Sequence, residues 1–220
     1  MSLKVRVTTS LVILFAALTY IFAWSPLFSV RTISTVGAPK EISAEALIAK
    51  SEISIGEKLS RIEPRSIERS LRELSWISKA SVDRNWLKGA VTIEVVPRIP
   101  VGIYMGKAID KSGTLFVLPG KKPVGLPVVS AASPELGLEA IALFTNLPEE
   151  IRLATISVSA SNTNFISSWQ EQGDRKLKIT WGSSRDLDLK VTVLQALLEL
   201  PENKSIKRVD LSAPHAPIVK

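Results

Sequence analysis

The sequence predicts an α+β protein: one N-terminal transmembrane helix, a small domain of β-α-α-β-β order, and a second α+β domain with an antiparallel or mixed sheet. An uncharged apolar run near the N-terminus predicts the first part, and strand-like and helix-like periodicities that alternate along the chain predict the other two. The expected boundaries are a short cytoplasmic tail over 1–7, the transmembrane helix over 8–25, the small domain over 26–98 and the second domain over 99–220.

Composition narrows the possible functions. The chain has 220 residues, enough for one or two domains with a real core. It has no cysteine, which excludes disulfides, thiolate metal sites and a cysteine nucleophile. The net charge is +7, but lysines and arginines are spread along the chain, so we expect no nucleic-acid partner.

The N-terminal run SLVILFAALTYIFAW, Ser10 to Trp24, predicts a membrane anchor. Extended towards the N-terminus as far as Val7, it gives 18 residues without a charge, about the length that crosses a bilayer as a helix. Tyr20 and Trp24 suit the far interface, and the basic start places the N-terminus in the cytoplasm. The alternative is a cleaved signal peptide, but Ile21-Phe22-Ala23 is a poor cleavage site, which favours an uncleaved anchor.

A strand and a short helix are expected to open the small domain. Apolar residues from Phe28 to Val36 form an extended segment that ends at Gly37. Ser43 has a side chain that favours a helix N-cap, and Ala46, Leu47 and Ala49 follow it. The stretch from Ile53 to Leu59 then predicts a loop with a glycine turn.

The second helix of the small domain is expected at PRSIERSLRELS, with Pro64 in its first turn. Ile67, Leu71 and Leu74 are spaced i, i+4, i+7 and make one apolar stripe. The arginines of this segment, which are Arg65, Arg69 and Arg72, are therefore expected to face water. Two strands with alternating apolar residues follow, around Ala80–Val82 and Val91–Val95, with Gly89 in the hairpin between them.

These residues resemble a known family. The β-α-α-β-β order behind a single anchor resembles a POTRA module, and the motifs resemble the FtsQ/DivIB family of bacterial cell-division proteins. The matching residues in this half of the chain are Phe28, Val30, Ile33, Gly37, Leu74, Trp76, Ile77, Ala80, Val82, Arg84 and Trp86. Thr35 and Leu87 depart from the pattern, which has an apolar residue and a proline there.

The resemblance continues through the second domain. Its motifs are matched at Arg98, Pro100, Val101, Gly102, Asp110, Gly113, Leu115, Phe116, Leu126, Pro127 and Val209 to Pro214, while Pro97 replaces an acidic residue. Among the matched residues, Gly37, Trp76, Arg84, Trp86, Arg98, Pro100, Asp110 and Gly113 are expected to be structural. Trp76 is expected in the core, and the two prolines end strand pairing near residue 98.

The second domain is expected to be rich in short strands. Strands are predicted over Gly102–Ile109, Leu115–Leu118 and Leu153–Ala160, and FISSWQ and KLKITW form a hairpin around Gly173. A helix follows Ser133, and SRDLDLKVTVLQALLELP forms another that Pro201 stops. The last strand is expected from Ile206 to Leu211, at an edge of the sheet, and the prolines in APHAPIVK are expected to keep the tail from pairing as a regular central strand.

No catalytic constellation is apparent in the sequence. The single histidine, His215, lies in the proline-rich tail, and the chain has no G-x-S-x-G, phosphate-binding or H-E-x-x-H motif. Asp83, Asp110, Asp186 and Asp188 fit turns, strand ends or different helix faces, although a carboxylate pair for glycan hydrolysis stays open. We therefore expect no catalytic residues, no metal and no cofactor. The alternative function is a membrane-anchored protein that binds or modifies the cell wall.

A binding function is the better prediction. The resemblance implies that the last strand receives a small single-span FtsB/DivIC-like protein, which itself pairs with an FtsL-like protein, and that other divisome components bind elsewhere. An open strand edge can accept such a partner through main-chain hydrogen bonds. The positions implied are Ile206, Lys207, Arg208, Val209, Asp210, Leu211 and Ser212. Lys207, Arg208 and Asp210 are expected to contact the partner by their side chains, while Val209 and Leu211 can instead face the core.

Overall fold

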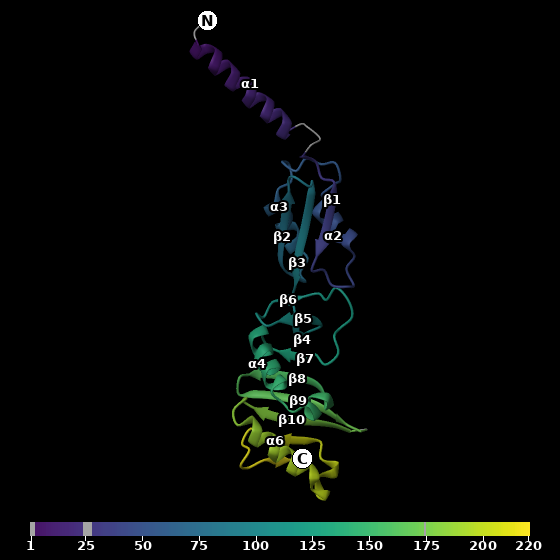
Figure 1. Ribbon diagram of the computed structural model, residues 1–220. Coiled ribbons are helices and arrows are strands. Elements are labelled where there is room, and N and C mark those ends of the chain that lie inside the picture. Colours follow the sequence, from purple (N-terminus) through teal and green to yellow (C-terminus); the bar gives the residue numbers. More distant parts are fainter. Residues whose placement is uncertain (1–2, 24–27, 174) are drawn as a thin grey trace. The chain divides into compact units, whose positions relative to one another are not determined.

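A computed structural model describes residues 3–23, 28–173 and 175–220 of the chain (Figure 1). The chain divides into two compact units, Met1–Arg98 and Ile99–Lys220. Each unit has its own sheet, so the α+β class with a mixed sheet is confirmed.

The N-terminal helix α1 spans Leu3–Ala23. Within the described ranges, no helix has both the length and the apolar character needed to cross a bilayer. The transmembrane helix predicted over 8–25 is therefore not confirmed. Residues 24 and 25 of that prediction lie outside the described part of the chain.

The first unit has the predicted β-α-α-β-β order. Its elements are β1 (Thr32–Val36), α2 (Ala44–Ser51), α3 (Pro64–Arg72), β2 (Ile77–Asn85) and β3 (Ala90–Pro97). Strand β3 lies in the middle, parallel to β1 and antiparallel to β2. The predicted cap is present, because the Ser43 hydroxyl accepts a hydrogen bond from the Ala46 N–H at 3.2 Å. Leu47, Leu71 and Ile93 are buried in the core of this unit.

The second unit contains a larger mixed sheet. Its described strands are β4 (Pro100–Tyr104), β5 (Lys107–Asp110), β6 (Leu115–Phe116), β7 (Val128–Ala131), β8 (Thr155–Asn162), β9 (Phe165–Gln172), β10 (Arg175–Gly182), β11 (Arg208–Asp210) and β12 (Ile218–Val219). Their order across the sheet is β12-β11-β10-β9-β8-β7-β4-β5-β6. The strand that is last in sequence therefore lies at one end of the sheet.

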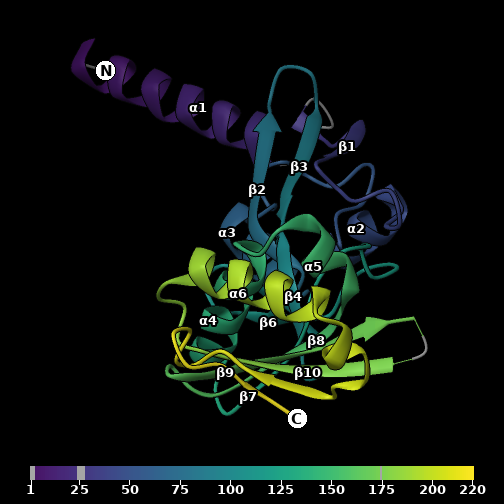
Figure 2. The same ribbon diagram turned by 90° about the horizontal axis from the view of Figure 1, so that it is seen from below.

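Helices cover one face of this sheet. They are α4 (Pro134–Thr145), α5 (Glu149–Ala154) and α6 (Leu187–Glu199), which is followed by the 3₁₀ helix η2 (Pro201–Ser205). Figure 2 shows α4, α5 and α6 on the same side of the strands. Between the two layers lies a core that includes Leu143, Ile166, Trp181 and Leu194. The opposite face of the sheet carries the other alternate set of side chains.

Two predicted strands of the second unit have other bounds in the structure. The single strand expected over Gly102–Ile109 is the hairpin β4–β5, because Met105 and Gly106 both adopt positive φ angles, of 46° and 85°, and reverse the chain. The strand expected from Leu153 begins two residues later, at Thr155, because Leu153 belongs to the short helix α5. Strand β7 and helix η2 were not expected.

Candidate partner-binding edge of the C-terminal sheet

The predicted binding strand does not itself form the edge of the sheet. Strand β11 pairs in parallel with β10 on one side and antiparallel with β12 on the other. The expectation of an open edge from Ile206 to Leu211 was therefore wrong. The proline-rich tail pairs as the outermost strand and not as a central one, and Ile218 and Val219 can do so because a proline just before a strand removes no ladder bond.

The hydrogen-bond pattern shows which backbone groups the outermost strand leaves open. The Arg208 N–H donates to the Lys220 carbonyl at 2.9 Å, and the Lys220 N–H donates to the Arg208 carbonyl at 3.0 Å. This exchange makes Arg208 and Lys220 a hydrogen-bonded pair, so the adjacent pair of Val209 and Val219 is non-hydrogen-bonded. The N–H and carbonyl of Val219 consequently point away from β11, towards the outside of the sheet.

A hollow of about 230 Å³ lies beside this edge. It is lined by Lys178, Thr180, Arg208, Val209, Asp210, Ile218 and Lys220, which come from β10, β11 and the segment of β12. Three of these side chains are cationic and one is acidic. The carboxylate of Asp210 already accepts hydrogen bonds from the N–H and hydroxyl of Ser212, at 2.9 and 2.7 Å. The site is therefore a shallow cationic surface at the end of a sheet.

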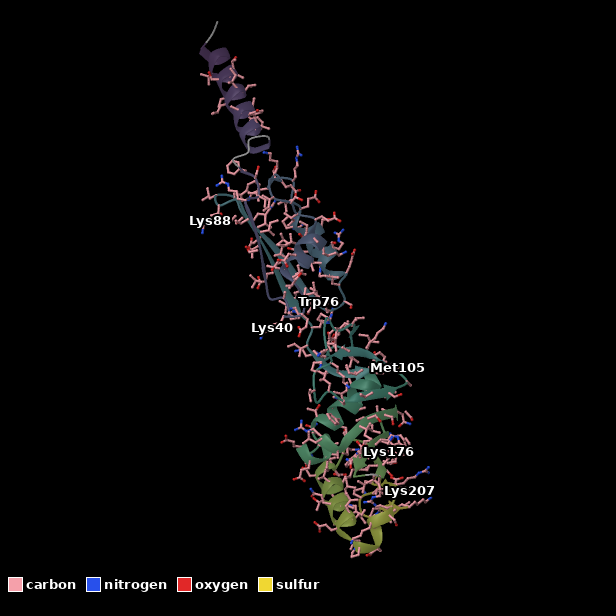
Figure 3. The ribbon with its side chains drawn as sticks, turned by 90° about the vertical axis from the view of Figure 1, so that its right-hand side faces the viewer. Lys40, Trp76, Lys88, Met105, Lys176 and Lys207 are labelled. Atoms are coloured by element: carbon pink, nitrogen blue, oxygen red, sulfur yellow. The ribbon has the colours of Figure 1, made fainter. Side chains whose placement is uncertain are left out.

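Further cations surround the hollow. Lys176 and Lys207 are exposed, and Figure 3 shows both on the same side of this unit. The Lys178 ammonium lies 5.9 Å from the ring centroid of Trp169, which is partly exposed on the neighbouring strand β9. Such a surface attracts acidic or aromatic ligands, since both charge and a ring face are available.

The residues predicted for partner contact differ in burial and in their hydrogen bonds. Val209 and Leu211 are buried in the core, as the alternation of a strand allows, and Asp210 and Ser212 bond each other in the turn after β11. Ile206 is partly buried, whereas Lys207 and Arg208 are exposed. The sequence reasoning missed Lys178 and Lys220. The alternation in KLKITW put Lys178 on a polar face, but nothing local indicated that β10 would lie beside β11.

The family-motif residues of the first unit have structural contacts. Arg84 donates through Nη1 to the carbonyls of Leu59 and Ile62, at 2.9 and 2.8 Å, and lies 5.3 Å from the ring centroid of Trp86. Trp76 is buried, and its carbonyl accepts from the Arg98 N–H at 2.7 Å. Arg98 also donates to the Ser75 carbonyl through Nε, at 3.0 Å. These contacts hold loops and strand ends in place.

The family-motif residues of the second unit stabilise its first turns. Pro100 opens β4 and pairs with Asp110 across the β4–β5 hairpin. One carboxylate oxygen of Asp110 accepts from the N–H and hydroxyl of Ser112 and from the N–H of Thr114, at 2.8, 2.6 and 3.1 Å. Gly113 has a φ of 84° in the same turn. The carboxylate of Asp110 is therefore engaged in a turn between β5 and β6.

No cluster of three or more histidine, aspartate or glutamate side chains that could hold a metal ion exists in the part of the chain that the structure describes. His215 lies exposed in the loop between β11 and β12. The arrangement at the edge can bind a ligand by charge and by backbone hydrogen bonds, but it brings no nucleophile, general base and oxyanion donor together.

Comparisons with known proteins place the chain among division proteins. A family model described as "POTRA domain, FtsQ-type" matches residues 28–98. A cell division protein FtsQ of Streptomyces bingchenggensis is 32% identical over 183 residues, which cover 76% of this chain and 67% of that protein. A protein of the same name from Streptomyces griseus is 28% identical over 86% of this chain and 96% of its own length. One from Corynebacterium glutamicum is 24% identical over 96% and 95%.

Proposed function

The chain belongs to the FtsQ family of cell division proteins, and we propose that it is a scaffold of the bacterial division septum that binds other division proteins and catalyses no reaction. Its proposed place is the membrane at the septum, with the sheets of both units outside the cytoplasm. The proposed partner is a small FtsB/DivIC-like protein that itself pairs with an FtsL-like protein, as the family resemblance implies.

One observation supports this binding mode: β12 lies at the end of the sheet and directs the backbone of Val219 outwards. A partner segment in extended conformation can add a strand there and gain main-chain hydrogen bonds. Lys178, Arg208 and Lys220 beside the edge favour an acidic partner segment and speed its association. The edge proposed from the sequence at β11 thus moves one strand outwards.

A proline substitution tests this edge. Val219→Pro removes the outward N–H and leaves the β11–β12 hydrogen bonds intact, because Arg208, Asp210 and their partners make those bonds. Loss of one backbone hydrogen bond, worth about 1 kcal/mol, should weaken binding of the FtsB/DivIC-like extracytoplasmic domain roughly five- to tenfold. Isothermal titration calorimetry with the purified full chain measures the effect.

The opposite end of the same sheet offers a matched control. Leu115 of β6 is paired with Ile109 of β5. The next pair along the hairpin is the hydrogen-bonded one, because the Asp110 N–H donates to the Thr114 carbonyl. The N–H of Leu115 therefore points away from β5, towards the outside of the sheet. Both Leu115 and Val219 are partly buried against the core. Leu115→Pro should leave binding unchanged.

Wild-type affinity in Val219→Pro would exclude the β12 edge, whereas no binding by the wild type would exclude this partner. A fluorescent fusion that fails to collect at the septum would contradict the proposed location.

A further inference from the structure

Helix α3 carries a row of three exposed arginines. Arg65, Arg69 and Arg72 are spaced i, i+4, i+7 and therefore lie on one face of the helix. The apolar residues of α3 have the same spacing and occupy the opposite face, where Leu71 is completely buried. The row extends over roughly 10 Å along the helix axis, given the rise per residue of an α-helix.

The acidic residues beside the row are turned towards neighbouring elements. The Glu68 carboxylate accepts a hydrogen bond from the Val82 N–H of β2, at 3.2 Å. The Glu73 carboxylate pairs with Lys50 of α2, at 2.8 Å, and this contact lowers the pKa of Glu73. Among the residues that the structure describes, none of the three arginines has a carboxylate within ion-pair distance. The carboxylates of Glu68 and Glu73 are thus engaged at the two sides of the row, and Arg72 donates through Nε to the Glu68 carbonyl, at 3.2 Å.

The row is unfavourable for the isolated helix. Like charges at i, i+4 and i, i+3 repel each other. Arg65 also lies in the first turn, where the helix dipole disfavours a cation, and that turn contains no acidic residue. A ligand that brings negative charge to this face would relieve both effects.

We propose that the arginine row of α3 binds an acidic helical segment of another protein, with carboxylates at the same i, i+4, i+7 spacing. Guanidinium groups bind carboxylates in a bidentate geometry, and carboxylates so spaced along a facing helix would meet all three. An anionic lipid surface fits less well, because a helix that lies on a membrane inserts an apolar face, and the apolar face of α3 is already packed in its own core. This surface lies in the first unit and is independent of the β12 edge.

Two peptide probes test the spacing. Both are alanine-based helices of about 20 residues with three glutamates, one with i, i+4, i+7 spacing and the other with the glutamates spread around the helix. Fluorescence anisotropy at low salt should show that the full chain binds the first peptide severalfold more tightly than the second. The Arg65→Gln/Arg69→Gln/Arg72→Gln variant should lose this binding roughly tenfold, since each exposed ion pair contributes only a little.

A control variant removes the same charge elsewhere in the unit. Lys40→Gln/Lys79→Gln/Lys88→Gln changes three exposed lysines outside α3, two of which Figure 3 marks, and should keep the affinity. Equal losses in the two variants, or equal affinity for the two peptides, would overturn the proposal. Arginine-dependent binding to phosphatidylglycerol vesicles without binding to either peptide would also overturn it, in favour of a lipid surface. The arginine variant should unfold at the same temperature as the wild type or higher, which separates lost binding from lost folding.

Discussion

Lys190 is a charged residue buried inside the second unit. Its side chain is only 2% exposed, and its ammonium donates a hydrogen bond to the Ser183 carbonyl at 2.7 Å. It thereby ties the first turns of α6 to the segment that leads out of β10. Burial lowers the pKa of Lys190 from its usual range, while Asp186 opposes this and Arg185 adds to it.

This pKa shift predicts a pH dependence of stability. The folded state binds the Lys190 proton less tightly than the unfolded state, so the free energy of unfolding rises with pH from the folded pKa up to lysine's ordinary value of about 10.4. Lys190→Met removes this group. Urea unfolding at pH 7 and pH 10 should show that the wild type gains stability relative to Lys190→Met. A difference between the two proteins that does not change with pH would contradict the shift.

Gly37 and Gly56 show why one glycine matters more than another. Both have left-handed backbone angles, with φ of 83° and 88°. A Cβ at Gly37 would overlap the Val95 carbonyl oxygen of β3, whereas a Cβ at Gly56 would meet no atom within 4 Å. Gly56→Ala should therefore cost about 1–2 kcal/mol of unfolding free energy, from the backbone angle alone. Gly37→Ala should cost about 1–3 kcal/mol more, because β1 and β3 must separate. Equal urea midpoints would show that the strands adjust freely.

At the scale of elements, the sequence correctly predicted the helices and hairpins that are stabilised by residues close together in the chain. Ser43 and Ser133 cap α2 and α4 through their hydroxyls, and Pro64 sits in the first turn of α3. The hairpins β2–β3 and β9–β10 join strands that are neighbours in sequence. In each case the residues that specify the element lie within it or next to it, so a single sequence was sufficient.

The elements that were missed depend on partners far along the chain. Strand β7 is held between β4 and β8 by parallel pairing, and it has only four residues of its own. Strand β12 has two, and its pairing with β11 decides which strand forms the edge. The candidate site was hard to predict for the same reason, since it also depends on residues that are far apart in the sequence. Lys207 and Arg208 could be proposed from the terminal motif, but the cluster with Lys178 exists only because β10 and β11 are adjacent.

At the scale of the whole molecule, the chain contains two separate hydrophobic cores. The core of the first unit includes Leu47, Leu71 and Ile93, and the described buried residues of the second unit's cluster run from Tyr104 to Leu211. Because each sheet is complete within its own unit, each unit has the buried apolar surface that cooperative folding requires. We therefore expect the two units to unfold as separate cooperative blocks.

A pair of core substitutions tests this independence. Leu71→Ala and Leu194→Ala each remove a side chain that is at most 1% exposed, one from each core. Each should cost about 2–5 kcal/mol in its own unit, through lost burial and the cavity that remains. Hydrogen exchange followed by mass spectrometry should then show faster exchange in residues 28–98 for Leu71→Ala and in residues 99–220 for Leu194→Ala. Faster exchange in both ranges for either variant would mean that the units fold as one block, because a substitution confined to one core can destabilise the other only through coupling between them.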